Sequence, residues 1–129
     1  MASAYLQKTI SSAGSNTIST LSTWVKLGNL GTARNIYSVS SGSTSVKVWF
    51  NTSNQLVLNA YEGSSTLNKI TSRVFFFFLS FYHIVVRYDT TDSTAEDRVQ
   101  LYVNGTRETS FGTNTNPSSS LDINLNKND

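Results

Sequence analysis

The sequence contains a single histidine, His83, at the end of the segment VFFFFLSFYH. A serine hydrolase would need this side chain beside a nucleophile and an orienting carboxylate. Asp89 lies six residues further on and would share a strand face with His83, but along a strand that separation is about 20 Å. The spacing therefore argues against nucleophilic catalysis and favours a histidine that is packed or hydrogen-bonded on a strand.

Paired carboxylates for glycoside hydrolysis are also missing from the sequence pattern. Such enzymes need two carboxyl groups about 5 to 10 Å apart, which on one strand means acidic residues at alternate positions. Glu62, Glu96 and Glu108 each lie apart from any such pattern. We therefore expect no glucanase activity, and we expect that the chain is not an enzyme.

One acidic segment, DTTDSTAED at residues 89–97, contains four of the eight carboxylates of the chain. Calcium binds several oxygen ligands, and the candidates here are Asp89, Asp92 and Asp97. The spacing does not match an EF-hand loop, and Asp97 lies next to Arg98. Two alternatives stay open, a calcium site or a solvated loop that caps itself. Calcium is the one cofactor that the sequence suggests.

Three aromatic residues are expected on the outward faces of strands: Trp49, Tyr61 and Tyr102. Exposed aromatic rings stack on the apolar C–H faces of sugars, and they also anchor protein interfaces. These residues are therefore the candidate glycan-binding site. The alternative is that sheet packing covers the rings, or that the assignment of inward and outward positions is shifted by one residue.

Four consecutive phenylalanines, Phe75, Phe76, Phe77 and Phe78, form the longest apolar run. In a strand, alternate members point to opposite faces, so one pair can enter a core while the other needs cover. Burial of a Phe side chain contributes about 1.5 to 3 kcal/mol, and exposed apolar side chains favour association. Three alternatives stay open: burial of both faces within the domain, a partner interface, or a misread stretch of sequence.

Composition and charge narrow the class of protein. The 129 residues correspond to one domain, 14% of them are charged, and the net charge is +2. The basic residues are scattered, so nucleic acid is not an expected partner. Cysteine is absent, which excludes disulfides and thiolate metal sites. The start of the sequence lacks the apolar segment of a signal peptide, and the longest apolar run is too short to be inserted across a membrane.

Period-two alternation over short segments predicts an all-β chain. The predicted strands lie in TISTLSTWVKL, RNIYSVSS, TSVKVWFN, QLVLNAY, FYHIVVRYD and RVQLYVNG. Asn104-Gly105 predicts a tight hairpin turn, because both central residues of such a turn need positive φ. STAEDR predicts one helical turn capped by Ser93. Together these features predict a single antiparallel β-sandwich over residues 1–129, in which the tail 112–129 is a final strand or a loose end.

Three segments in order, TLSTWVKLGNLGT, FYHIVVRYDTT and DRVQLYVNG, resemble the laminin-G-like, concanavalin-A-like jelly roll found in structural proteins of bacteriophages and marine viruses. The matching residues are Ser22, Trp24, Val25, Lys26, Tyr82, His83, Ile84, Val85, Asp89, Tyr102, Val103, Asn104 and Gly105. The resemblance covers roughly residues 4–111 and implies a jelly-roll topology.

Two features depart from the family pattern. Phe76, Phe77, Phe78 and Leu79 stand where the family has a polar turn, and Phe81 stands where tryptophan is usual. Family members also continue with strands that close the sandwich. The sandwich is therefore open at its C-terminal end, or a partner completes it, or the sequence is part of a longer one.

The resemblance implies a non-enzymatic module on the surface of a virion, such as a capsid decoration, a head fibre or a tail-fibre domain. It would act either by docking to other capsid or tail proteins or by adhering to host-surface glycans. A homo-oligomer, for example a trimer, would cover exposed phenylalanines and the open sheet edge. The alternative is a free carbohydrate-binding lectin that could depend on calcium.

Overall fold

The structure is a computed structural model that describes residues 12, 14–63, 65–76 and 80–123. Its elements in chain order are β1 (Ile18–Lys26), β2 (Arg34–Ser41), β3 (Thr44–Phe50), β4 (Gln55–Glu62), β5 (Ser65–Val74), β6 (Phe81–Asp89), the 3₁₀ helix η1 (Ala95–Asp97), β7 (Val99–Val103), β8 (Thr106–Glu108) and β9 (Phe111–Thr115). Among the described residues, no helix has the length and apolar character needed to span a membrane.

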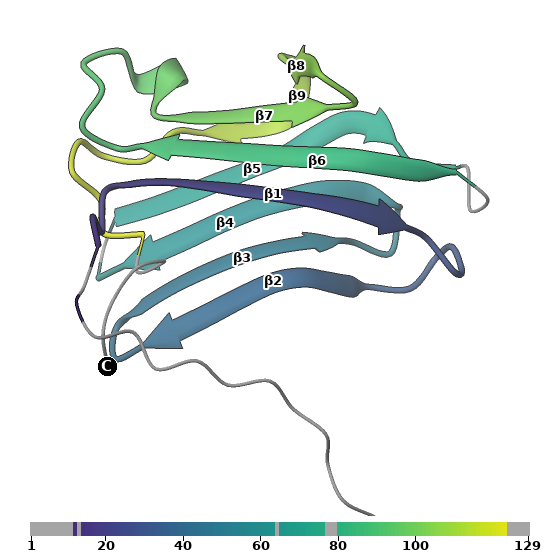
Figure 1. Ribbon diagram of the computed structural model, residues 1–129, viewed down its shortest axis with the longest axis horizontal. Coiled ribbons are helices and arrows are strands. Elements are labelled where there is room, and N and C mark those ends of the chain that lie inside the picture. Colours follow the sequence, from purple (N-terminus) through teal and green to yellow (C-terminus); the bar gives the residue numbers. More distant parts are fainter. Residues whose placement is uncertain (1–11, 13, 64, 77–79, 124–129) are drawn as a thin grey trace, which may run out of the picture.

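The strands form two antiparallel sheets that pack face to face (Figure 1). One sheet has four strands in the order β1-β6-β7-β8, and the other has five in the order β2-β3-β4-β5-β9. β1 and β6 are far apart in the sequence but pair over the whole length of both strands, without a bulge. The predicted all-β antiparallel sandwich is confirmed.

The core consists of alternate residues of the central strands, on the faces that the period-two pattern predicts. These inward residues are Val46, Val48 and Phe50 on β3, Leu56, Leu58 and Ala60 on β4, Tyr82, Ile84, Val86 and Tyr88 on β6, and Val99, Leu101 and Val103 on β7. Each is less than a tenth exposed. Burial of this apolar surface between the sheets is the main stabilising term of the fold.

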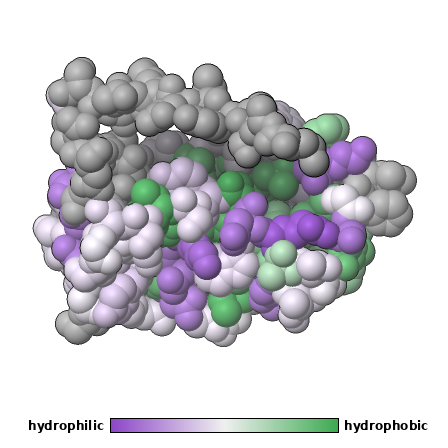
Figure 2. Space-filling view, turned by 90° about the horizontal axis from the view of Figure 1, so that it is seen from below, coloured by the Kyte–Doolittle hydropathy of each residue, from purple (hydrophilic) through white to green (hydrophobic). Residues whose placement is uncertain are grey.

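The edge strands β1 and β2 are less completely covered. Their partly buried apolar residues are Leu21, Val25, Ile36, Tyr37 and Val39. Viewed from the β2 side, apolar side chains reach the surface between hydrophilic ones (Figure 2). Within the tail 112–129, residues 112–115 belong to β9, Leu121 and Ile123 are buried in the core, and residues 124–129 lie outside the described part of the chain.

Two local predictions concern the loops between β6 and β8. Asn104 and Gly105 have φ angles of 51° and 79°, so the predicted tight turn is confirmed. The predicted helical turn is η1, but its N-cap residue is Thr94 and not Ser93, and no side chain caps it.

The phenylalanine run begins directly after β5. Phe75 is 1% exposed, and its ring makes edge-to-face contacts with Phe50 and Tyr82, each at 5.0 Å between ring centroids. Phe76 is 62% exposed. Phe75 is therefore a core residue, and its assignment to a partner interface is wrong. Phe76 stays a candidate interface residue, while Phe77 and Phe78 lie outside the described residues.

The two described phenylalanines predict a sharp contrast in stability. Phe75→Ala removes a ring from the packed core and is expected to lower the free energy of unfolding by about 3 to 5 kcal/mol. Phe76→Ala, the matched control, is expected to change it by less than about 0.5 kcal/mol. Urea unfolding followed by fluorescence measures both, and equal losses in the two variants would contradict the assignment.

Candidate functional site

Four side chains gather on the outer face of the four-stranded sheet, where β1 and β6 run side by side (Figure 1). The register pairs Trp24 with His83 and Lys26 with Phe81. Residues two apart on a strand share a face, so the two pairs are neighbours on this outer surface. We call Trp24, Lys26, Phe81 and His83 the β1–β6 block.

The indole of Trp24 is held in place by His83. The two rings stack with centroids 4.7 Å apart and an angle of 18° between their planes. The imidazole is itself anchored, because its Nε2 lies 2.9 Å from the Ser22 hydroxyl oxygen and the backbone N–H of His83 donates to Asn104 Oδ1 at 2.8 Å. Since β1 is the outermost strand of its sheet, the other face of the indole is turned away from β6. Trp24 is 67% exposed, so this face is open to solvent.

Lys26 and Phe81 form the second pair of the β1–β6 block. The Lys26 Nζ lies 5.7 Å from the centroid of the Phe81 ring, a cation–π contact. Among the described residues, Lys26 forms no ion pair. The block therefore combines exposed aromatic rings with a cation that is not paired with any carboxylate of the described residues.

The three aromatic residues that the sequence suggested as a glycan site do face outward. Trp49 and Tyr61 lie on the five-stranded sheet, however, whereas Tyr102 lies on the four-stranded sheet. The expectation of one shared platform is wrong, because these sheets face opposite directions. The ring of Trp49 is also half-buried under Lys47, whose Nζ lies 5.6 Å from its centroid. Tyr102 shares the face of the β1–β6 block, and its hydroxyl donates to Gln100 at 2.9 Å.

Trp24 and Phe81 were not selected from the sequence, although a signal for Trp24 was present. In ISTLSTWVK, Leu21 and Val25 have the parity of inward residues, so Trp24 must point outward. That parity does not show that His83 is the neighbour of Trp24, which depends on the pairing of β1 with β6.

The sequence also matches a family model, described as the concanavalin A-like lectin/glucanases superfamily, over residues 2–126. The chain belongs to this superfamily. The predicted jelly-roll class and the resemblance to laminin-G-like, concanavalin-A-like domains are therefore confirmed, and a domain of this kind fits a carbohydrate-binding or adhesion module. No curated protein and no solved structure matches the chain significantly.

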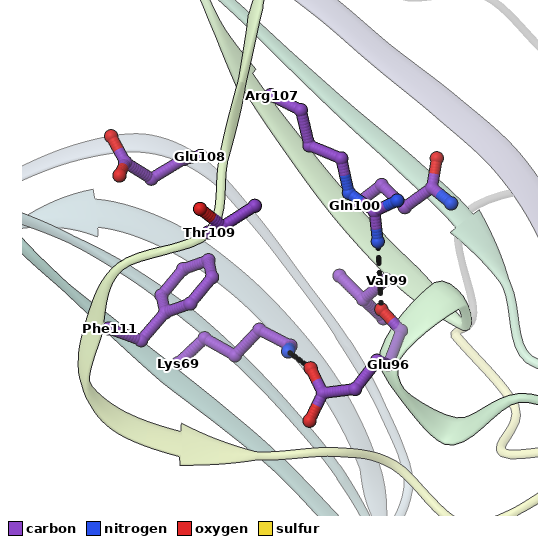
Figure 3. A pocket seen from close by; sticks show the side chains of 8 residues that line it. All are labelled: Lys69, Glu96, Val99, Gln100, Arg107, Glu108, Thr109 and Phe111. Carbon is purple, nitrogen blue, oxygen red and sulfur yellow. Dashed lines mark hydrogen bonds and ion pairs between the residues drawn. The ribbon is translucent and has the colours of Figure 1, made fainter.

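Because the superfamily includes glucanases, two carboxylates in one pocket of this concanavalin A-like domain would be candidates for catalysis. A pocket of about 310 Å³ opens between the two sheets (Figure 3). Its lining residues are Lys69, Glu96, Val99, Gln100, Arg107, Glu108, Thr109 and Phe111. The fold thus brings Glu96 and Glu108, which are isolated in the sequence, to the same pocket.

The charged groups of this pocket already have partners. Lys69 is 1% exposed, and its Nζ donates to Asn114 Oδ1 at 2.6 Å and lies 3.5 Å from Glu96 Oε2. Burial lowers the pKa of Lys69. Hydrogen bonds from the amides of Asn116 and Asn114 lower the pKa of Glu96. A glycosidase needs one carboxyl group held protonated by a raised pKa, and Glu96 has the opposite shift.

Glu108 also forms an ion pair, because the Arg73 Nε donates to its carboxylate at 2.8 Å. The pocket therefore has the character of a structural network that ties β5 to η1 and β9. His83 has the hydroxyl of Ser22 2.9 Å from its Nε2, so a triad would further need an orienting carboxylate beside the ring. Among the described residues no carboxylate contacts it, and Asp89 is paired with Arg87 at 2.9 Å.

The candidate calcium ligands likewise bind side chains and backbone of the chain. Asp89 pairs with Arg87, Asp97 accepts from Arg107, and Asp92 Oδ1 accepts from the backbone N–H two residues further on. The hydrogen bond from Arg107 lowers the pKa of Asp97. Within the described part of the chain, no group of three or more metal-ligating side chains is arranged to hold a metal ion. These contacts favour the self-capped loop, and calcium binding stays a prediction.

The lowered pKa of Glu96 predicts a pH dependence of stability. A carboxyl group with a lowered folded-state pKa stabilises the fold above its ordinary value, here 4.5, and loses this effect as the pH falls through the folded-state pKa. The difference in unfolding free energy between wild type and Glu96→Gln is therefore expected to be full at about pH 7 and to shrink towards about pH 3. Urea titrations across this range measure it, and a difference that does not vary with pH would contradict the network.

The stack between Trp24 and His83 can be tested with tryptophan fluorescence. In a Trp49→Phe background, Trp24 is the single tryptophan, because the chain has only two. Replacing His83 by Leu removes the stacking ring, so the Trp24 indole is expected to become more accessible to iodide quenching and more mobile in anisotropy. His83→Phe keeps a ring at this position and is expected to restore most of the wild-type signal. Identical quenching in all three proteins would contradict the stack.

Proposed function

We propose that this domain is a non-enzymatic adhesion module that binds carbohydrate through the β1–β6 block. The observation that supports this most strongly is the open indole face of Trp24, 67% exposed and stacked on His83. A flat aromatic face matches the apolar C–H face of a pyranose ring. Trp24 and Phe81 are both exposed and lie on the same face, and neighbouring exposed apolar side chains of this kind favour a binding role.

The stack of Trp24 on His83 also lowers the entropy cost of binding a ligand. A ring that is already fixed in the free protein loses little conformational freedom when a ligand covers it. The polar groups nearby, including the Ser22 hydroxyl, offer hydrogen-bond partners for sugar hydroxyls. One exposed ring gives weak affinity, so adhesion would depend on many copies that bind together.

We further propose that the module is displayed on a virion, as a capsid decoration, head fibre or tail-fibre domain. The support is the resemblance of three segments of the chain to phage and marine viral structural proteins. A virion displays many copies of one protein, which would supply the avidity that a weak sugar site requires. Phe76, 62% exposed at the end of β5, is the candidate contact for neighbouring capsid or tail proteins or for further copies in a homo-oligomer.

A free lectin is the alternative, and it would use the same block. The two functions differ in where the protein is found. Co-sedimentation of the protein with intact particles in a density gradient favours the virion module, whereas recovery only in the unsedimented fraction favours the lectin.

Removal of the Trp24 ring tests the carbohydrate site. On an array of neutral and acidic oligosaccharides, wild type is expected to bind a defined subset, and Trp24→Ala is expected to lose about tenfold or more in affinity, equivalent to about 1.4 kcal/mol. Trp49→Phe is the matched control, because Trp49 lies on the opposite sheet under Lys47, and it should bind as wild type does. Equal binding by Trp24→Ala and wild type would overturn the assignment of the site.

A further inference from the structure

The β1–β6 block has an electrostatic character that separates it from the rest of its sheet. Lys26 is exposed and, among the described residues, forms no ion pair. None of the nine residues of β1 is acidic. We propose that the ligand of this block is an acidic carbohydrate, whose sugar ring stacks on Trp24 and whose carboxylate binds Lys26. This inference rests on the proposed carbohydrate-binding function.

The strands of the four-stranded sheet carry two acidic residues, and neither lies beside Lys26. Asp89 is at the other end of the sheet, and Glu108 is on the opposite edge strand β8, level with Leu21 and paired with Arg73. The register places Ile18 of β1 opposite Asp89, and Lys26, at the far end of the same strand, opposite Phe81. Eight residue steps along a strand correspond to about 27 Å. The Debye length is about 8 to 10 Å at physiological salt, so the acidic loop at residues 89–97 does not neutralise the field around Lys26. Of the charges that the structure describes, an anionic group approaching the block therefore meets the positive charge of Lys26.

The positions of the ring and the cation allow one ligand to use both. Lys26 lies over Phe81 and leaves the open face of Trp24 uncovered. Two residues along a strand separate Trp24 and Lys26 by about 7 Å, a distance that one substituted sugar ring and a flexible lysine side chain can bridge. The similar pair on the other sheet differs, because Lys47 lies over Trp49 itself and covers its ring.

The test compares sugars that differ only in charge. Hexasaccharides of galacturonate, of mannuronate and of hyaluronan are each titrated against their own methyl esters, which keep the ring and lose the charge. For at least one pair, wild type is expected to bind the acid about 3- to 10-fold more tightly than the ester at low salt, the range expected of an exposed charge contact. Salt at about 0.5 M is expected to remove most of this preference.

Variants of two lysines test whether the preference for the acid over its ester comes from the β1–β6 block. Lys26→Gln is expected to bind acid and ester equally, with the affinity of wild type for the ester. Lys47→Gln, the matched cation beside an aromatic ring on the opposite sheet, is expected to keep the full preference. Circular dichroism confirms that each variant is folded, which is expected because both side chains are exposed.

The outcomes separate this inference from the function on which it rests. If wild type binds acids and esters equally or binds only neutral sugars, the acidic ligand is overturned and carbohydrate binding stands. If the preference for the acid persists in Lys26→Gln, the assignment of the acidic group to Lys26 and to this block is overturned. If wild type binds no sugar in the titrations or on the oligosaccharide array, both are overturned.

Discussion

Burial of alternate side chains between two sheets is the constraint on which the whole molecule depends. The central strands β3, β4, β6 and β7 each turn one apolar face inward, and the period of two then directs the intervening residues to the outer side of the sheet. Val57 on β4 is an intervening residue that is nevertheless buried. Along the central part of a strand, burial of one residue therefore also determines that its sequence neighbours point to the outer side. His83 is on the outer face of β6 because Tyr82 and Ile84 are in the core.

Two lysines of this domain have contrasting environments, one buried and paired and the other exposed. Inside the pocket between the sheets, the buried Lys69 would be costly without partners, and Asn114, Glu96 and the Phe111 ring surround its ammonium group. On the β1–β6 block, Lys26 remains in water and is free of carboxylates among the described residues. A network in which every charge is paired serves the fold, whereas an exposed unpaired cation beside open aromatic rings is suited to binding.

Membership of a superfamily that includes both lectins and glucanases does not by itself choose between them. The side chains of this particular sandwich favour the proposed binding function over a glucanase. Glu96 and Glu108 share a pocket, but hydrogen bonds stabilise the ionised form of Glu96 and Arg73 holds Glu108. Among the described residues, the most exposed aromatic ring is that of Trp24, which lies on a sheet face, stacked on His83, where it can contact a sugar.

Six strand segments, the tight turn at Asn104-Gly105 and the alternation of inward and outward residues follow from the sequence alone, whereas β5 and β8 lie outside the predicted segments. These features are local, since they depend on side-chain alternation and on the φ angles that particular residues accept. Sequence could not show which strands become neighbours. The stack of Trp24 on His83, and the separation of Trp49 and Tyr61 from Tyr102, depend on the order of strands in each sheet. Phe75 and Phe76 are identical in type, and only the packing after β5 makes one a core residue and the other a surface residue. Contacts between distant segments are decided by how two whole sheets bury their apolar faces together, which no single segment encodes.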